Sequence, residues 1–127
     1  MKNLPFHQIV AVLFLVPVMA ATFASSVHAH AVVIETSMKE MPVRPGQATE
    51  VEIRFNSAVE AKLSRIFLID IGGKELALKI SAGSSPDRLV VELPALPAGA
   101  YIFRYRVLAA DGHFTDNALR FRISNNP

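Results

Sequence analysis

Apolar and polar residues alternate along most of the chain after residue 30, with a period of two. The alternation is clearest at 49–55, where Val51, Ile53 and Phe55 are separated by charged residues. Successive side chains of a strand point to opposite faces of a sheet, so this pattern predicts strands with one buried face. The expected strands are 31–35, 49–55, 65–71, 75–80, 88–93, 101–107 and 119–123.

Turn-forming residues separate these segments. Glycine, proline and serine cluster at 44–46, 72–73, 83–86 and 94–99. Seven short strands with a turn about every ten residues are typical of an antiparallel β-sandwich of the immunoglobulin type. We therefore expect an all-β fold, in which 58–63 forms at most one helical turn.

The first 29 residues differ from the rest of the chain. They contain one lysine, Lys2, then an apolar run at 9–24 and a short stretch that ends in small residues. These features are typical of a secretory signal peptide cleaved after Ala29. We therefore expect a signal peptide at 1–29 and one exported domain at 30–127. Two alternatives stay open, an uncleaved membrane anchor and cleavage a few residues earlier, for instance after Ala24.

The charge balance and the lack of cysteine argue against some kinds of binding site. All acidic residues and all basic residues except Lys2 follow the leader, so the charges of the exported part nearly balance. Nothing in this balance favours nucleic-acid binding. The chain has no cysteine, which excludes disulfides and thiolate metal sites, so the fold depends on its apolar core.

Cleavage after Ala29 makes His30 the first residue, and His113 is then the only other histidine. An N-terminal histidine offers its α-amine and its ring Nδ1 to one metal ion, and a second histidine adds a third nitrogen. Three nitrogens with a carboxylate nearby, here Asp111, suit Cu(II), which favours nitrogen and oxygen donors in a tetragonal array. Asp111 either binds the metal axially or orients the other ligands. Alternatively, Asp111-Gly112-His113 is only a turn, since Asp-Gly is a common hairpin dipeptide.

A family resemblance supports the hypothesis of a metal site. The run LPAGAYIFRYRVLAADGH at 96–113, with Val32-Val33-Ile34, 55–60 and Ser64-Arg65, resembles the CopC copper-resistance family. The resemblance covers nearly the whole exported part. It implies a small cupredoxin-like or immunoglobulin-like β-barrel that binds one Cu(II) ion. The implied ligands are His30, through its amine and its ring, with Asp111 and His113.

The same resemblance implies a periplasmic protein that buffers or delivers copper in copper homeostasis and resistance. Its expected partner is an inner-membrane copper transporter or an exported copper enzyme. We expect a monomer without enzyme activity. Two other functions stay open, a histidine-brace copper oxidase or monooxygenase and a metal-free β-sandwich that serves as an interaction module.

The chain departs from the family pattern at three places. Family members commonly have Phe-Ser-Glu where this chain has Phe55-Asn56-Ser57, so an acidic group near the copper is missing. The segment 114–117 follows the Asp-Gly-His motif where a proline turn is common. Some family members also carry a methionine-rich Cu(I) site. Here Met38 and Met41 are the only methionines after the leader, and we expect no Cu(I) site from them.

Four arginines alternate with mostly apolar residues in the last two expected strands: Arg104, Arg106, Arg120 and Arg122. If these strands pair, the arginines form a basic stripe suited to an acidic partner or anionic lipid headgroups. We expect instead a solvated face whose charge is neutralised by Glu50, Glu52 or Glu92, since salt screens such surface charges.

Overall fold

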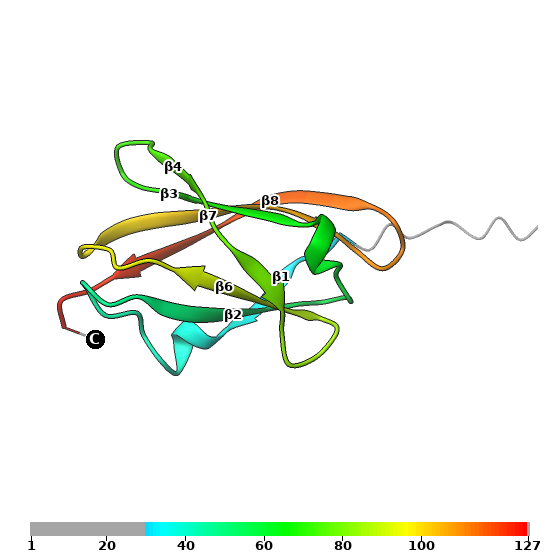
Figure 1. Ribbon diagram of the computed structural model, residues 1–127, viewed down its shortest axis with the longest axis horizontal. Coiled ribbons are helices and arrows are strands. Elements are labelled where there is room, and N and C mark those ends of the chain that lie inside the picture. The colour runs from blue at the N-terminus through cyan, green and yellow to red at the C-terminus, as the bar shows by residue number, and fades with distance from the viewer. Residues whose placement is uncertain (1–29, 127) are drawn as a thin grey trace, which may run out of the picture.

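The computed structural model describes residues 30–126, which form two antiparallel four-stranded sheets packed face to face (Figure 1). The elements are β1 (Val33–Thr36), η1 (Ser37–Lys39), β2 (Thr49–Phe55), η2 (Ala61–Leu63), β3 (Arg65–Ile69), β4 (Glu75–Ala77), β5 (Ile80–Ala82), β6 (Arg88–Leu93), β7 (Gly99–Leu108) and β8 (Phe114–Ile123). The strand orders are β1-β2-β6-β5 and β4-β3-β7-β8. The all-β antiparallel sandwich expected from the sequence is confirmed. The signal peptide expected at 1–29 lies outside the described residues.

One expected strand is divided between the two sheets. The segment 75–80 is not a single strand, because β4 pairs with β3 whereas β5 pairs with β6. The chain crosses over at Leu78, whose N–H donates to the Ile66 carbonyl, and at Lys79, whose carbonyl accepts from the N–H of Glu92. The part of the chain that the structure describes therefore has eight strands rather than seven.

The last hairpin is longer than the sequence pattern suggests. β7 and β8 pair without interruption from Gly99 opposite Ile123 to Leu108 opposite Phe114. Residues 116–118 of β8 are all exposed, so the alternation that marks the other strands is lost there. The expected helical turn at 58–63 is the short 3-10 helix η2. No helix among residues 30–126 is long and apolar enough to cross a membrane.

The core lies between the two sheets. It is built mainly from alternate residues of β2, β3, β6 and β7 that face the other sheet, and eight of them are at most 1% exposed: Val51, Ile53, Phe55, Ile66, Leu89, Val91, Phe103 and Val107. The ring of Phe55 meets Tyr105 edge-on, with centroids 5.6 Å apart. Burial of this apolar layer is the main force that holds the two sheets together.

Ion pairs cover the outer face of the first sheet. Arg88 Nη1 lies 2.7 Å from Glu52 Oε1, and Arg54 Nε lies 3.0 Å from Asp87 Oδ2. The hydrogen bond from Arg88 is the main cause that holds the pKa of Glu52 below its ordinary value. The pKa of Asp87 is also lowered, first by the hydroxyl of Ser85 and then by Arg54.

These two carboxylates predict how stability depends on pH. A carboxyl with a lower pKa in the folded state stabilises the fold above its unfolded pKa, and this stabilisation disappears as the pH falls through the folded pKa. We therefore expect the free energy of unfolding to decrease below about pH 4.5, and less steeply in the double variant Glu52→Gln, Asp87→Asn. Urea unfolding at several pH values measures this, with Glu50→Gln on the same strand as the control. Parallel pH profiles for the double variant and the parent protein would contradict the prediction.

Candidate metal centre

The Asp-Gly-His segment forms the tight loop between β7 and β8. Ala109 N donates to the His113 carbonyl at 2.9 Å, and Gly112 N donates to the Ala109 carbonyl at 3.0 Å. Gly112 has a φ of 85°, in the left-handed region that glycine adopts without a steric penalty. The segment is therefore a turn, as an Asp-Gly pair predicts, and this turn determines where its two functional side chains lie.

Asp111 and His113 lie together in this loop. Asp111 Oδ1 accepts a hydrogen bond of 3.0 Å from the backbone N–H of His113, and Asp111 Oδ2 lies 3.4 Å from His113 Nδ1. The side chains are 39% and 56% exposed, respectively. A carboxylate beside Nδ1 favours the tautomer with the proton on that nitrogen, in which Nε2 carries the lone pair that a metal ion binds.

The start of the described chain is fixed beside the same loop. His30 is exposed, whereas Ala31 is completely buried. Ala31 N donates a hydrogen bond of 3.0 Å to Thr115 Oγ1, and Thr115 lies in β8 two residues after His113. Figure 1 shows the start of β1 and the loop between β7 and β8 at one end of the molecule.

The segment after β2 holds the start of β1 from another side. Asn56 Oδ1 accepts a hydrogen bond of 2.8 Å from Val32 N, and Asn56 N donates to the Val32 carbonyl at 2.9 Å. Ser57 occupies the position where the family resemblance leads us to expect an acid. Its buried Oγ makes no hydrogen bond within the described residues. Asn56 thus holds the backbone of Val32 by two hydrogen bonds, and Ser57 supplies no carboxylate at the position of the expected acid.

The loop is also held by residues on both sides of η2. Ala110 N donates to the Ala58 carbonyl at 3.0 Å. Ser64 is completely buried, and its Oγ donates to the Glu60 carbonyl at 2.7 Å and accepts from Leu108 N at 3.1 Å. These bonds attach the end of β7 to the neighbouring chain, so the loop that carries Asp111 and His113 has a fixed base.

The structure joins two of the three expected ligands and positions the neighbour of the third. Across residues 30–126, no group of three or more His, Cys, Asp or Glu side chains is placed to hold a metal ion. The α-nitrogen of His30 is an amide in the uncleaved chain and becomes an amine only after cleavage. The donor types at this end, imidazole and carboxylate, are ones that Cu(II) accepts.

Thr115 and Asn56 were not expected to take part in this site. Neither belongs to the usual ligand types, and both act on the backbone of residues that precede β1. The sequence does indicate that Thr115 points inward. It stands an even number of residues before the buried Ile123, and residues at such a spacing lie on the same face of β8.

Comparisons with known proteins agree with this architecture. The sequence matches the family described as CopC domain over residues 33–124, a range that includes Asp111 and His113. CopC from Methylosinus trichosporium OB3b is 27% identical, with 75% of this chain and 94% of that chain covered and a TM-score of 0.61. A comparison with curated protein sequences finds no match.

A second solved structure shows the same fold at lower identity. PcoC, a methionine rich copper resistance protein from Escherichia coli, is 19% identical, with 76% of this chain and 100% of that chain covered and a TM-score of 0.55. At this identity the likeness concerns the fold alone. The family match, by contrast, extends over most of the sequence, and on this ground the chain belongs to the CopC family.

Proposed function

We propose that this protein is a periplasmic Cu(II)-binding protein that buffers or delivers copper. The observation that carries the proposal is the pairing of Asp111 with His113 in a braced loop beside the anchored start of β1. Membership of the CopC family supports it.

The proposed ligands are the amine and ring of His30 and the ring of His113, with Asp111 as an axial ligand or as the group that orients His113. The bond between Ala31 N and Thr115 Oγ1 supports this set, because it anchors the residue next to His30 beside the loop and so keeps the α-nitrogen of His30 within one residue of the anchor. Three nitrogens and one oxygen are a donor set typical of tetragonal Cu(II).

The exposed position of this loop suits exchange of the ion with another protein. An amine binds copper only in its neutral form, and its ordinary pKa is about 7.7 to 8.0, so protons compete with the metal. An inner-membrane copper transporter or an exported copper enzyme is the recipient that we propose. Copper is here the cargo of the protein, not a catalytic cofactor.

Blocking the free amine of His30 tests the site. We expect protein that begins at His30 to bind one Cu(II) ion and to give a nitrogen-rich tetragonal spectrum in electron paramagnetic resonance. Acetylation of the His30 amine should abolish this spectrum, because it turns the amine into an amide, adds no new amine and leaves both rings in place. Identical spectra of the two proteins would contradict the proposed ligands. N-terminal sequencing of the exported protein establishes whether cleavage leaves His30 first.

A further inference from the structure

The outer face of the second sheet carries a stripe of basic residues. Because β7 and β8 pair in continuous register, four arginines lie on the same face: Arg104, Arg106, Arg120 and Arg122. The carboxylates expected to neutralise them belong to Glu50, Glu52 and Glu92, which lie in β2 and β6 of the other sheet. That expectation is therefore wrong, and the stripe needs other partners.

Only one half of the stripe finds such partners. Arg104 pairs with Glu75 of β4, and Arg106 Nη1 lies 3.2 Å from Asp116 Oδ2. Within residues 30–126, the side chains of Arg120 and Arg122 form no ion pair and no hydrogen bond. Two exposed positive charges thus stand uncompensated at one end of the sheet.

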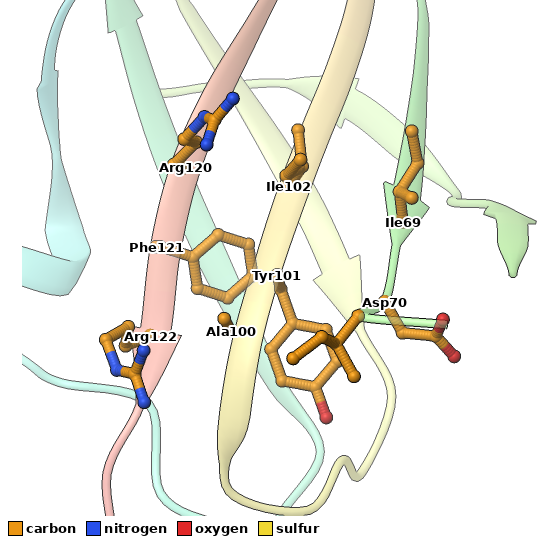
Figure 2. A pocket seen from close by; sticks show the side chains of 9 residues that line it. Ile69, Asp70, Ala100, Tyr101, Ile102, Arg120, Phe121 and Arg122 are labelled. Carbon is orange, nitrogen blue, oxygen red and sulfur yellow. The ribbon is translucent and has the colours of Figure 1, made fainter. Parts of the chain in front are cut away.

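The sheet face is hollowed beside these two arginines. Figure 2 shows Arg120 and Arg122 on β8, with Ile102 of β7 beside Arg120 and Ile69 of β3 on the far side of Ile102. The cavity has a volume of about 490 Å³. Ile69, Ile102 and Arg120 stand in one row across the three strands. Ala100, which is paired with Arg122, leaves room because its side chain is a single methyl group.

The hollow continues past the end of β3. A second cavity of about 390 Å³ shares Asp70, Ala100 and Arg122 with the first one. Ile71, which lines both cavities, is 91% exposed. The two cavities together form a groove with an apolar floor, two arginines along one side and an exposed isoleucine near its end.

We propose that this groove binds an acidic peptide segment of a partner protein. Carboxylates of the segment pair with Arg120 and Arg122, and an apolar side chain enters the hollow over Ile69, Ala100 and Ile102. The Cα atoms of two residues at alternate positions of a strand are about 7 Å apart, a separation that two neighbouring acidic side chains of a peptide span. Arginine binds carboxylates through two parallel N–H groups, which adds directionality to the attraction.

The charges around the groove favour a peptide over a membrane surface. Among the residues that line the groove, the basic ones are Arg120 and Arg122 of β8, while Asp70 stands on the β3 side with its carboxylate directed away from these arginines (Figure 2). A uniformly anionic surface would meet Asp70 as well as the arginines, and like charges brought together oppose binding. A short segment places its carboxylates on the β8 side only.

The groove is distant from the proposed copper loop. Ala100 stands near the beginning of β7, and the loop follows Leu108 at its other end, roughly 26 Å away at the usual rise per residue. A partner bound in the groove therefore leaves the loop accessible. The groove can accordingly be tested on protein without copper.

A titration followed by nuclear magnetic resonance tests the groove. The probe is the peptide Gly-Glu-Glu-Leu-Leu-Gly, added to the exported, copper-free, ¹⁵N-labelled protein. We expect saturable amide shifts in 99–103 and 119–123, and at least about fivefold weaker binding by the double variant Arg120→Gln, Arg122→Gln. The control is Arg104→Gln with Arg106→Gln, which removes equal charge from the same face and should change binding by less than about twofold.

Three results would overturn the proposal. Equal weakening in both double variants would show unspecific attraction to net charge, and equal binding of a peptide with glutamine in place of glutamate would remove the role of the carboxylates. Binding to phosphatidylcholine vesicles that contain phosphatidylglycerol, without binding of the peptide, would show a membrane surface instead. None of these measurements involves copper, so their failure leaves the copper site untouched.

Discussion

Replacing His113 with alanine is expected to lower the affinity of the cleaved protein for Cu(II) by at least about 100-fold. The removal of a group that merely orients a ligand already costs about 10- to 100-fold in metal affinity, so the loss of a ligand should reach the upper end of this range. Competition with a chromophoric chelator measures the change. The loop should keep its shape, because its closing bond joins the backbones of Ala109 and His113.

Two further variants test the negative charge of Asp111 and, as a control, that of the neighbouring carboxylate Asp116. Asp111→Asn keeps an oxygen that accepts the His113 N–H and removes the negative charge, so we expect a loss of about tenfold. Asp116→Asn removes an exposed carboxylate that pairs with Arg106, and it should leave copper affinity unchanged. Full affinity in His113→Ala would return the loop to a plain turn and would favour a metal-free interaction module.

The strands were predictable where burial on one face leaves a regular pattern. The expected bounds of β2 and β6 are those of the structure. The segment 75–82 was not predictable in the same way, because Leu76, Leu78 and Ile80 continue the alternation across the point where the chain changes sheets. Whether such a segment pairs with β3 or with β6 depends on long-range neighbours, which a local pattern does not specify.

The candidate site also has one part that was predictable from the sequence and one part that was not. Asp111 and His113 are two residues apart and were predictable as a pair, because the turn between them is encoded locally by Gly112. The hydrogen bonds that anchor the residues just before β1 were not predictable, since the bonded residues Ala31 and Thr115 are 84 positions apart. Likewise, the arginine stripe was expected only on the condition that the last two strands pair, and the carboxylates that neutralise half of it follow from the topology.

The aromatic layer between the sheets should carry a large part of the stability. We expect Phe55→Ala to lower the free energy of unfolding by about 3 to 5 kcal/mol, through lost burial and the cavity that remains. Phe55 is completely buried and meets Tyr105 edge-on, and its backbone pairs with Val33 of β1. Domains of this size are typically stable by about 5 to 15 kcal/mol, and no disulfide limits the loss here.

Urea unfolding of the copper-free protein measures this loss, with Ile71→Ala as the control. Ile71 is 91% exposed, so its truncation should change the free energy of unfolding by no more than about 0.5 kcal/mol. A loss below about 1 kcal/mol in Phe55→Ala would contradict the described core. A ligand that binds only the folded state stabilises that state, so Cu(II) should raise the melting temperature of the Phe55→Ala protein. Such a rise would show that the weakened fold still forms the proposed copper site.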